Sequence, residues 1–264
     1  SGEGEYEKGT TAVVTASANS NYIFGGWTDT GALVCTGSVY SFQVDKNTTL
    51  MANFFLKTSD CGKLISKYKN NTALQSAMGN IRSKVANNAR LEYTYTASDS
   101  GTLEFFQGTD TYTHYDYSNF SSYDFIIHNH PSGIPILSGS DLYGLYLSIV
   151  NNKGHIGTRM IVQTDNGTMS AEIEDVSVFL KFCDEHFAGD NNIETYDSDF
   201  KKEIMEQATA TQSKTIEYIN KAINYFQQNG LKVAFCFGDS ASQDWAYAKY
   251  TNNIMSFYDC LTNI

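Results

Sequence analysis

The chain has 264 residues, 41% of them hydrophobic and 14% aromatic, so it is long enough for one large or two modest domains with packed cores. Its formal net charge of −11 argues against nucleic acid and anionic membranes as partners. It contains no apolar run of about eighteen residues, so we expect no membrane span. The N-terminus lacks the pattern of a signal peptide and looks like the start of an excised segment.

The first 56 residues predict a small all-β module. Short runs rich in β-branched and aromatic residues are separated by glycine, asparagine and serine, and they lie at residues 12–16, 21–27, 40–44 and 48–54.

The run from Asn21 to Trp27 (Asn-Tyr-Ile-Phe-Gly-Gly-Trp) and the closing Ala-x-Phe at residues 52–54 carry a family resemblance. They resemble a divergent internalin-type B repeat, the kind that occurs in tandem in bacterial surface proteins. Asn21 replaces the usual glycine, and the expected first strand of the repeat is missing. A generic β module is the alternative. In both cases we expect Tyr22, Phe24 and Trp27 in the core of the module.

Residues 57 to 190 alternate between helical and strand-like patterns. Helices are expected near 72–88, 139–152 and 176–187, and strands near 90–97, 102–107 and 122–128. Two further strand-like runs flank Asp165, Asn166 and Gly167, a pattern typical of a hairpin. This mixture of elements predicts an α+β protein.

Residues 128 to 141 hold two of the five histidines and both prolines of the chain. His128 and His130 stand two positions apart, and Asp141 follows in the same segment. If the histidines end a strand, both imidazoles can point toward one site once the chain curls into the following loop. Imidazole and carboxylate together suit Zn²⁺, and three protein ligands leave a fourth position open for water. The sequence therefore predicts a catalytic zinc site and not a closed structural one.

The pattern His-x-His, seven residues, Ser, two residues, Asp resembles the signature of the JAMM (MPN-type) metallopeptidases, and His-Asn-His-Pro-Ser-Gly at 128–133 is similar to their RadC-type branch. The resemblance implies a mixed-sheet α/β domain over residues 57–190 that hydrolyses peptide or isopeptide bonds. In it Ser138 would hydrogen-bond the anionic intermediate. The acidic net charge weighs against a RadC-like role at DNA.

A structural alternative exists for the same residues. Ser138 and Asp141 also form a capping box that opens a helix, and Pro131, Gly133 and Pro135 could simply make a rigid turn. The two interpretations are compatible, because a capped helix start would hold the Asp141 carboxylate in place.

A general base is the remaining part of such a peptidase, and the resemblance implies a glutamate on a strand upstream of the histidines. Glu92 directly follows the helix expected near 72–88, as the glutamate of the family does, and Glu104 lies in the next strand-like run. We favour Glu92 as the base and keep Glu104 as the alternative. The structural alternative for Glu92 is an ordinary solvent-facing strand residue without a catalytic role.

Residues 191 to 264 are expected to form a mainly helical extension. A helical pattern at 199–228 ends at Gly230, the expected C-cap, and a short buried strand follows at 231–237. A last helix is expected from 239 to about 261. These helices either pack on the catalytic domain or form a surface for a partner.

Two functions from different classes are consistent with these patterns. The first is a zinc-dependent peptidase or isopeptidase that acts on a protein or peptide substrate. The complete His-x-His, Ser, Asp set favours it, because a scaffold has no physical need of all four residues. The second is a non-catalytic surface interaction protein with a JAMM-like scaffold.

The repeat implies the surface of a bacterial cell or secretion from it. The JAMM relatives are mostly intracellular, and five cysteines, an odd number, fit a reducing interior, so the cytoplasm is the alternative. The cysteines form no Cys-x-x-Cys motif and are expected to be buried thiols.

Overall fold

The computed structural model describes residues 2, 4–30, 32–56, 66–110, 112–113, 123–151, 158–187, 196, 200, 212–237, 246–248, 250–251 and 254–255. The chain divides into two compact units. One comprises residues 1–70 together with 234–264, and the other comprises residues 71–233.

The N-terminal module consists of five strands, namely β1 (Thr11–Thr15), β2 (Tyr22–Asp29), β3 (Ala32–Cys35), β4 (Val39–Gln43) and β5 (Leu50–Leu56). β1 pairs with β4, and β2 lies between β3 and β5; all of these pairs are antiparallel. The expected all-β character of this segment is confirmed.

Aromatic side chains fill the core of this module. Phe24 and Trp27 are buried, with ring centroids 5.7 Å apart, and Phe54 from the closing Ala-x-Phe packs on Phe24 at 5.5 Å. Edge-to-face contacts of this kind stabilise beyond the burial of apolar area alone. Trp27 and Phe24 are therefore core residues, as expected from the sequence, whereas Tyr22 is only half-buried.

The second unit follows the predicted order of elements closely. Its elements are α2 (Thr72–Asn87), β6 (Tyr93–Ser98), β7 (Leu103–Gln107), β8 (Tyr123–Asn129), α3 (Gly139–Asn151), β9 (Arg159–Thr164), β10 (Gly167–Ile173), α4 (Val176–Phe187), α6 (Gln212–Gln228) and the start of β11 (Leu231–Phe237).

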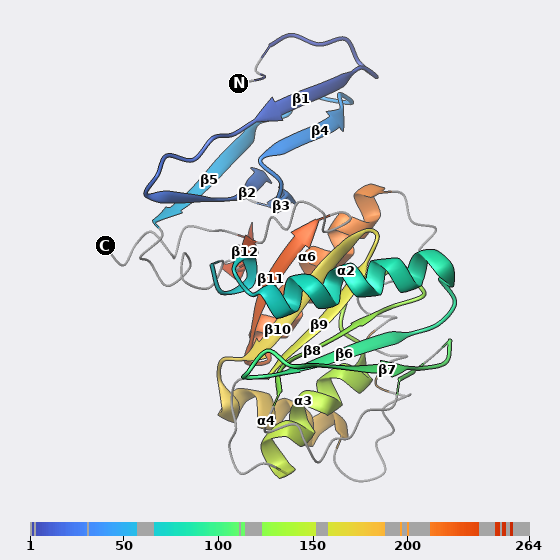
Figure 1. Cartoon of the computed structure of the whole chain (residues 1–264). Helices are drawn as coiled ribbons and strands as arrows, with labels where there is room; N and C mark the ends of the chain where they lie inside the picture. The colour runs from blue at the N-terminus through green and yellow to red at the C-terminus, as the bar shows by residue number, and fades with distance from the viewer. Residues whose placement is uncertain are drawn as a thin grey trace. The chain divides into compact units, whose positions relative to one another are not determined.

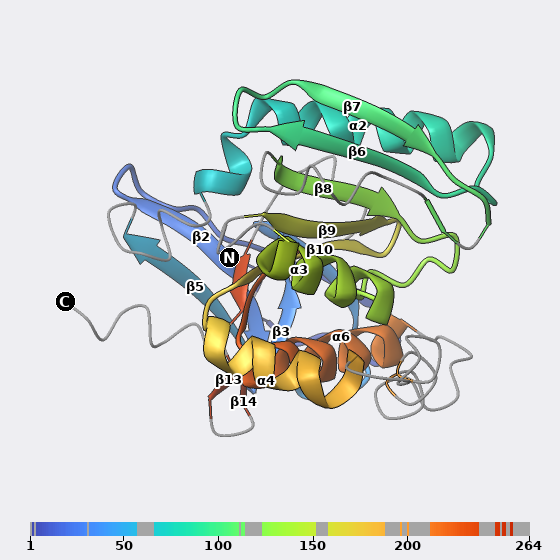
Figure 2. The same ribbon diagram turned by 90° about the horizontal axis from the view of Figure 1, so that it is seen from below.

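The strands of this unit form a mixed sheet in the order β11-β10-β9-β8-β6-β7. β8 and β9 are parallel, whereas β6 is antiparallel to both β7 and β8. Parallel neighbours need a crossover connection, and α3 is part of that connection. The chain therefore leaves the carboxyl end of β8 and enters the N-terminus of α3, the place where open α/β sheets form their sites. Figures 1 and 2 show α2 on one face of this sheet and α3 on the other.

β8 is buried on both of its faces. Phe125, Ile126 and Ile127 are fully buried, which agrees with their continuous apolar run. The strand runs on without a break into His128, which is also buried. The sequence thus places a polar side chain, that of His128, in a buried environment, where it needs a hydrogen-bonding partner.

Two turn predictions are confirmed. β9 and β10 form an antiparallel hairpin in which Gly167 faces Thr164. Gly230 follows the end of α6 with a φ of +81°, and its carbonyl accepts hydrogen bonds from the backbone of Glu174 and Asp175. A glycine suits this left-handed conformation because it has no Cβ.

The expected last helix is wrong wherever the structure describes that segment. Residues 246–248 form β12, which lies next to β11, and residues 250–251 (β13) pair antiparallel with residues 254–255 (β14). Tyr and Thr, which favour extended backbone, occur throughout this stretch, and the helical spacing that we inferred gave them too little weight. The other residues between 239 and 261 lie outside the described part of the chain, as do Cys61 and Cys260. Cys183 is a buried thiol, as expected, whereas Cys35 is only half-buried.

Candidate metal centre

The N-terminus of α3 holds Asp141 in a capping box. The Asp141 carboxylate Oδ2 accepts hydrogen bonds from the Ser138 backbone N–H at 2.7 Å and from the Ser138 hydroxyl at 2.8 Å. In return, the Asp141 backbone N–H donates to Ser138 Oγ at 3.3 Å. A carboxylate in the first turn of a helix is also favoured by the helix dipole. The predicted capping box is thus present, and it leaves Asp141 Oδ1 directed away from the cap.

The loop after β8 turns His130 toward the same place. The Gly133 N–H donates to the His130 carbonyl at 3.0 Å, and the Gly133 carbonyl accepts from Asn166 Nδ2 at 2.7 Å. His130 Nδ1 donates to the Ile134 carbonyl at 3.2 Å. This hydrogen bond puts the proton on Nδ1 and leaves the lone pair of Nε2 available, which is the usual arrangement for a histidine that binds a metal.

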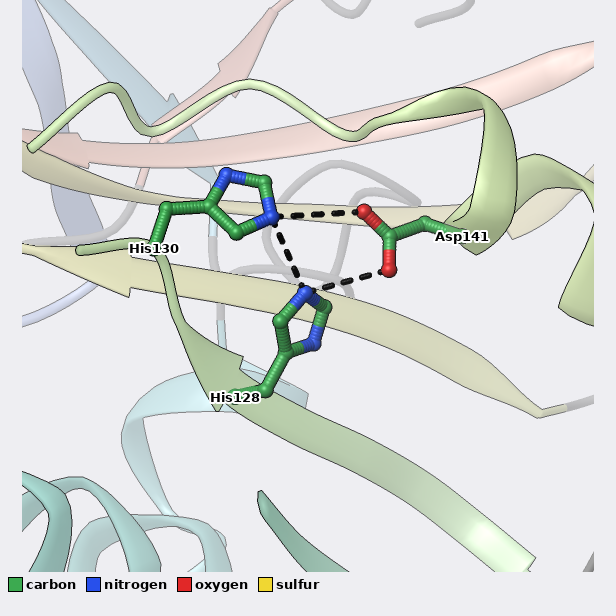
Figure 3. Close-up of side chains that lie close together, drawn as sticks. All are labelled: His128, His130 and Asp141. Atoms are coloured by element: carbon green, nitrogen blue, oxygen red, sulfur yellow. Dashed lines mark hydrogen bonds and ion pairs between the residues drawn. The ribbon is translucent and has the colours of Figure 1, made fainter. Parts of the chain in front are cut away.

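His128, His130 and Asp141 converge on one point, as Figure 3 shows. The two Nε2 atoms are 3.2 Å apart, His128 Nε2 lies 3.0 Å from Asp141 Oδ1, and His130 Nε2 lies 3.6 Å from Asp141 Oδ2. Tetrahedral zinc with bonds of ~2.0–2.2 Å keeps neighbouring ligand atoms about 3.3–3.6 Å apart. The measured distances run to both carboxylate oxygens of Asp141 and are close to this spacing, so the three side chains could hold one metal ion.

The charges of the cluster compensate each other in the absence of a metal. Burial alone would lower the pKa of His128, but the carboxylates of Asp141 and Glu92 raise it to about 9. Burial alone would raise the pKa of Asp141, but the two histidines hold it well below its usual range. His128 and Asp141 are 2% and 5% exposed, so solvent screens this pair little.

His128 Nδ1 has no hydrogen-bond partner among the described residues, and neither does the hydroxyl of Thr94. These two residues face each other in the ladder between β6 and β8, where directly opposed side chains point to the same face of the sheet. The two unpartnered polar atoms therefore belong to side chains that project from the same face of the sheet at paired positions.

Glu92 lies beside the cluster, one residue before β6. Its Oε1 is 3.9 Å from His128 Nε2, and Glu92 is only 9% exposed. Burial raises the pKa of the Glu92 carboxyl above its usual range, and the neighbouring His128 offsets part of this increase. A carboxylate with a raised pKa is better suited to accept a proton near neutral pH.

Glu104 has a different environment from Glu92. It is exposed on β7, where it faces Thr96 in the ladder, and its Oε2 accepts a hydrogen bond of 3.4 Å from the Tyr123 hydroxyl. The structure thus brings Glu92, His128, His130, Ser138 and Asp141 together and leaves Glu104 on the edge strand. Our reasoning from the sequence overlooked Asn129, which ends β8 and is 3% exposed. The available indication in the sequence was a second polar residue, after His128, at the end of a strand whose apolar run predicts burial.

Comparison with known proteins concerns the N-terminal module. No curated protein and no solved structure matches the chain. No helix in the described part of the chain is both long and apolar enough to cross a membrane. Residues 1–58 match the family model of the divergent InlB B-repeat domain, which confirms the N-terminal repeat in this 264-residue chain.

Proposed function

We propose that the second unit is a JAMM-like zinc hydrolase that cleaves peptide or isopeptide bonds. The observation that carries this proposal is the convergence of His128, His130 and Asp141 on one point, with Glu92 beside them. The resemblance to the JAMM metallopeptidases rests on the motif at residues 128–141. The similarity to their RadC-type branch rests on residues of the same segment.

The side chains divide the work of hydrolysis. His128 and His130 would bind zinc through Nε2, and Asp141 would bind it through a carboxylate oxygen. When bound, zinc supplies Lewis acidity and lowers the pKa of water toward ~7. The Glu92 carboxylate accepts a proton from the attacking water and returns it to the nitrogen of the leaving amine.

Ser138 has two hydrogen-bond donors with separate tasks. Its backbone N–H holds Asp141 Oδ2 at 2.7 Å, whichever way the hydroxyl points. The hydroxyl can therefore rotate from Asp141 toward the substrate and donate to the oxyanion that develops at the cleaved carbonyl. In this proposal Ser138 orients a metal ligand in the resting site and stabilises the transition state during the reaction.

We place the protein outside a bacterial cell, either displayed on its surface or secreted. The support is the repeat at residues 1–58, because repeats of this type are typical of bacterial surface proteins. The substrate would then be a protein or peptide in the same compartment, and the cytoplasm is the alternative location.

A non-catalytic interaction protein is the second candidate. The charges of the cluster are compensated without a metal, since His128 pairs with Asp141 at 3.0 Å and the Ser138 hydroxyl donates to the same carboxylate. A scaffold of this kind would keep the fold of the second unit and use the surface of the repeat or of the C-terminal elements to bind a partner.

Cleavage by the zinc-loaded full chain distinguishes the two candidates. Peptide and isopeptide libraries are incubated with the wild-type chain and with Glu92→Gln, and the products are identified by mass spectrometry. Glu92→Gln should retain zinc and fold but lose at least about 100-fold in kcat, because the amide cannot accept a proton. Cleavage by Glu92→Gln at the wild-type rate would rule out Glu92 as the base, and Glu104→Gln would then be tested.

A further inference from the structure

Asn129, the residue between the two histidines, directs its side chain to the backbone of a neighbouring segment. Its Oδ1 accepts a hydrogen bond from the Tyr93 backbone N–H at 2.8 Å, and its Nδ2 donates to the Leu91 carbonyl at 3.0 Å. Glu92 is the residue between these two. Because Asn129 is 3% exposed, water competes little for either hydrogen bond.

The side chain of Asn129 replaces a missing part of the sheet. The ladder between β6 and β8 ends at the pair of Thr94 and His128, so Tyr93 and the residues before it have no β8 backbone partner in that ladder. Buried backbone groups need hydrogen bonds, and the amide offers one acceptor and one donor at the required spacing. Asn129 thereby binds two further residues, Tyr93 and Leu91, which stand on either side of Glu92.

The opposite side of the segment is held by the loop that follows β7. The Glu92 N–H donates to the Thr109 carbonyl at 2.7 Å, and the Glu92 carbonyl accepts from the Gly108 N–H at 2.8 Å. A Cβ at Gly108 would lie 2.2 Å from the Tyr112 carbonyl oxygen, so this close approach of the backbone requires a glycine. Four hydrogen bonds from two sides therefore fix the backbone around Glu92.

We propose that Asn129 is a positioning residue that fixes the Glu92 carboxylate beside His128. The inference rests on the proposed function, in which Glu92 is the base. Adjacent strand residues point to opposite faces, so His128 turns to the metal site while Asn129 turns to the segment that carries the base. The dipeptide His128-Asn129 thus links the position of a metal ligand to the position of the base. Catalytic groups must keep their positions to within about 0.5 Å.

The test compares Asn129→Ala with Asn53→Ala in the full, zinc-loaded chain. Asn53 is a matched control, a buried asparagine of the other unit whose Nδ2 donates to the Gly26 carbonyl at 3.1 Å. In Asn129→Ala, amide hydrogen exchange at Tyr93 should rise at least about tenfold, because its acceptor is lost. The kcat for hydrolysis should fall about 10–100-fold at unchanged zinc content. Asn53→Ala should change neither quantity.

A double variant separates positioning of the base from a general loss of structure. Added to Glu92→Gln, Asn129→Ala should cause no further loss in kcat, because the group that it positions is already disabled. A multiplicative loss would overturn the proposal, and so would unchanged exchange at Tyr93. If Asn129→Ala fails to fold, Asn129→Ser, which keeps a hydroxyl but cannot span both backbone groups, should show the same two effects.

Failure of the hydrolase proposal has a different signature. If the wild-type chain binds zinc but cleaves no substrate, the hydrogen bonds of Asn129 to the backbone around Glu92 have no role in catalysis. The exchange measurement would then still decide whether Asn129 fixes the segment, since it does not depend on turnover.

Discussion

The metal-free and metal-bound forms of the proposed site differ in the protonation of His128. With a pKa of about 9, His128 carries a proton at neutral pH, and this imidazolium is the partner of the Asp141 carboxylate. A metal requires the neutral imidazole, so binding must displace that proton.

Zinc binding at pH 7 should therefore release about one proton from His128, and the apparent affinity should rise about tenfold per pH unit up to roughly pH 9. Calorimetric titration in buffers with different ionisation enthalpies measures the number of protons released. The stability of the metal-free fold depends on pH in the opposite direction to the zinc affinity. The raised pKa stabilises the metal-free fold below about pH 6.5, and this contribution is lost as the pH rises through about 9. Binding without proton release would show that His128 is already neutral.

At the scale of elements, the capping box links the start of α3 to the geometry of the site. Ser138→Ala removes one donor to Asp141 Oδ2 and the acceptor for the Asp141 N–H. We expect a loss of about 1 kcal/mol in the free energy of unfolding, typical of a lost N-cap, and weaker zinc binding.

Asp175→Ala is the matched control, because Asp175 accepts from the backbone N–H of Ser177 and Val178 at the start of α4. It should cost a similar free energy of unfolding, measured by urea denaturation, and leave the zinc affinity unchanged. Equal zinc affinities in the two variants would contradict a role for Ser138 in holding the ligand.

Local patterns predicted most elements of the second unit, because hydrophobic periodicity and turn residues act over short distances. The same reasoning failed at residues 246–255, where it expected a helix and the described residues form short strands. The motif predicted which side chains meet at the candidate metal centre. It could not predict that Asn129 binds the backbone at residues 91 and 93, because that contact depends on the register between β6 and β8.

A second long-range contact illustrates the same limit. Arg159 is fully buried and pairs with Asp124, which also accepts from Asn71, the N-cap of α2. These three residues come from separate elements, and no local pattern relates them. Burying an arginine is costly unless it is paired, so the register of β8 and β9 had to be known before this pair could be expected.

At the scale of the whole molecule, the repeat and the candidate metal centre belong to different compact units. The core of the N-terminal module consists of residues between 14 and 54, and the proposed ligands lie in the unit of residues 71–233. A chain without residues 1–58 should therefore still bind zinc with wild-type affinity. Calorimetry on the truncated chain, with circular dichroism as a check of folding, measures this. A folded truncated chain that has lost zinc binding would contradict the separation of the two functions.

The zinc content of the purified full chain tests the central claim most directly. After zinc loading and removal of excess metal, inductively coupled plasma mass spectrometry should find about one zinc per wild-type chain and per Glu92→Gln chain. His128→Ala and Asp141→Asn should retain essentially none while still folding. Wild-type chain that remains free of zinc after loading, or variants that retain zinc equally well, would contradict a metal centre at His128, His130 and Asp141.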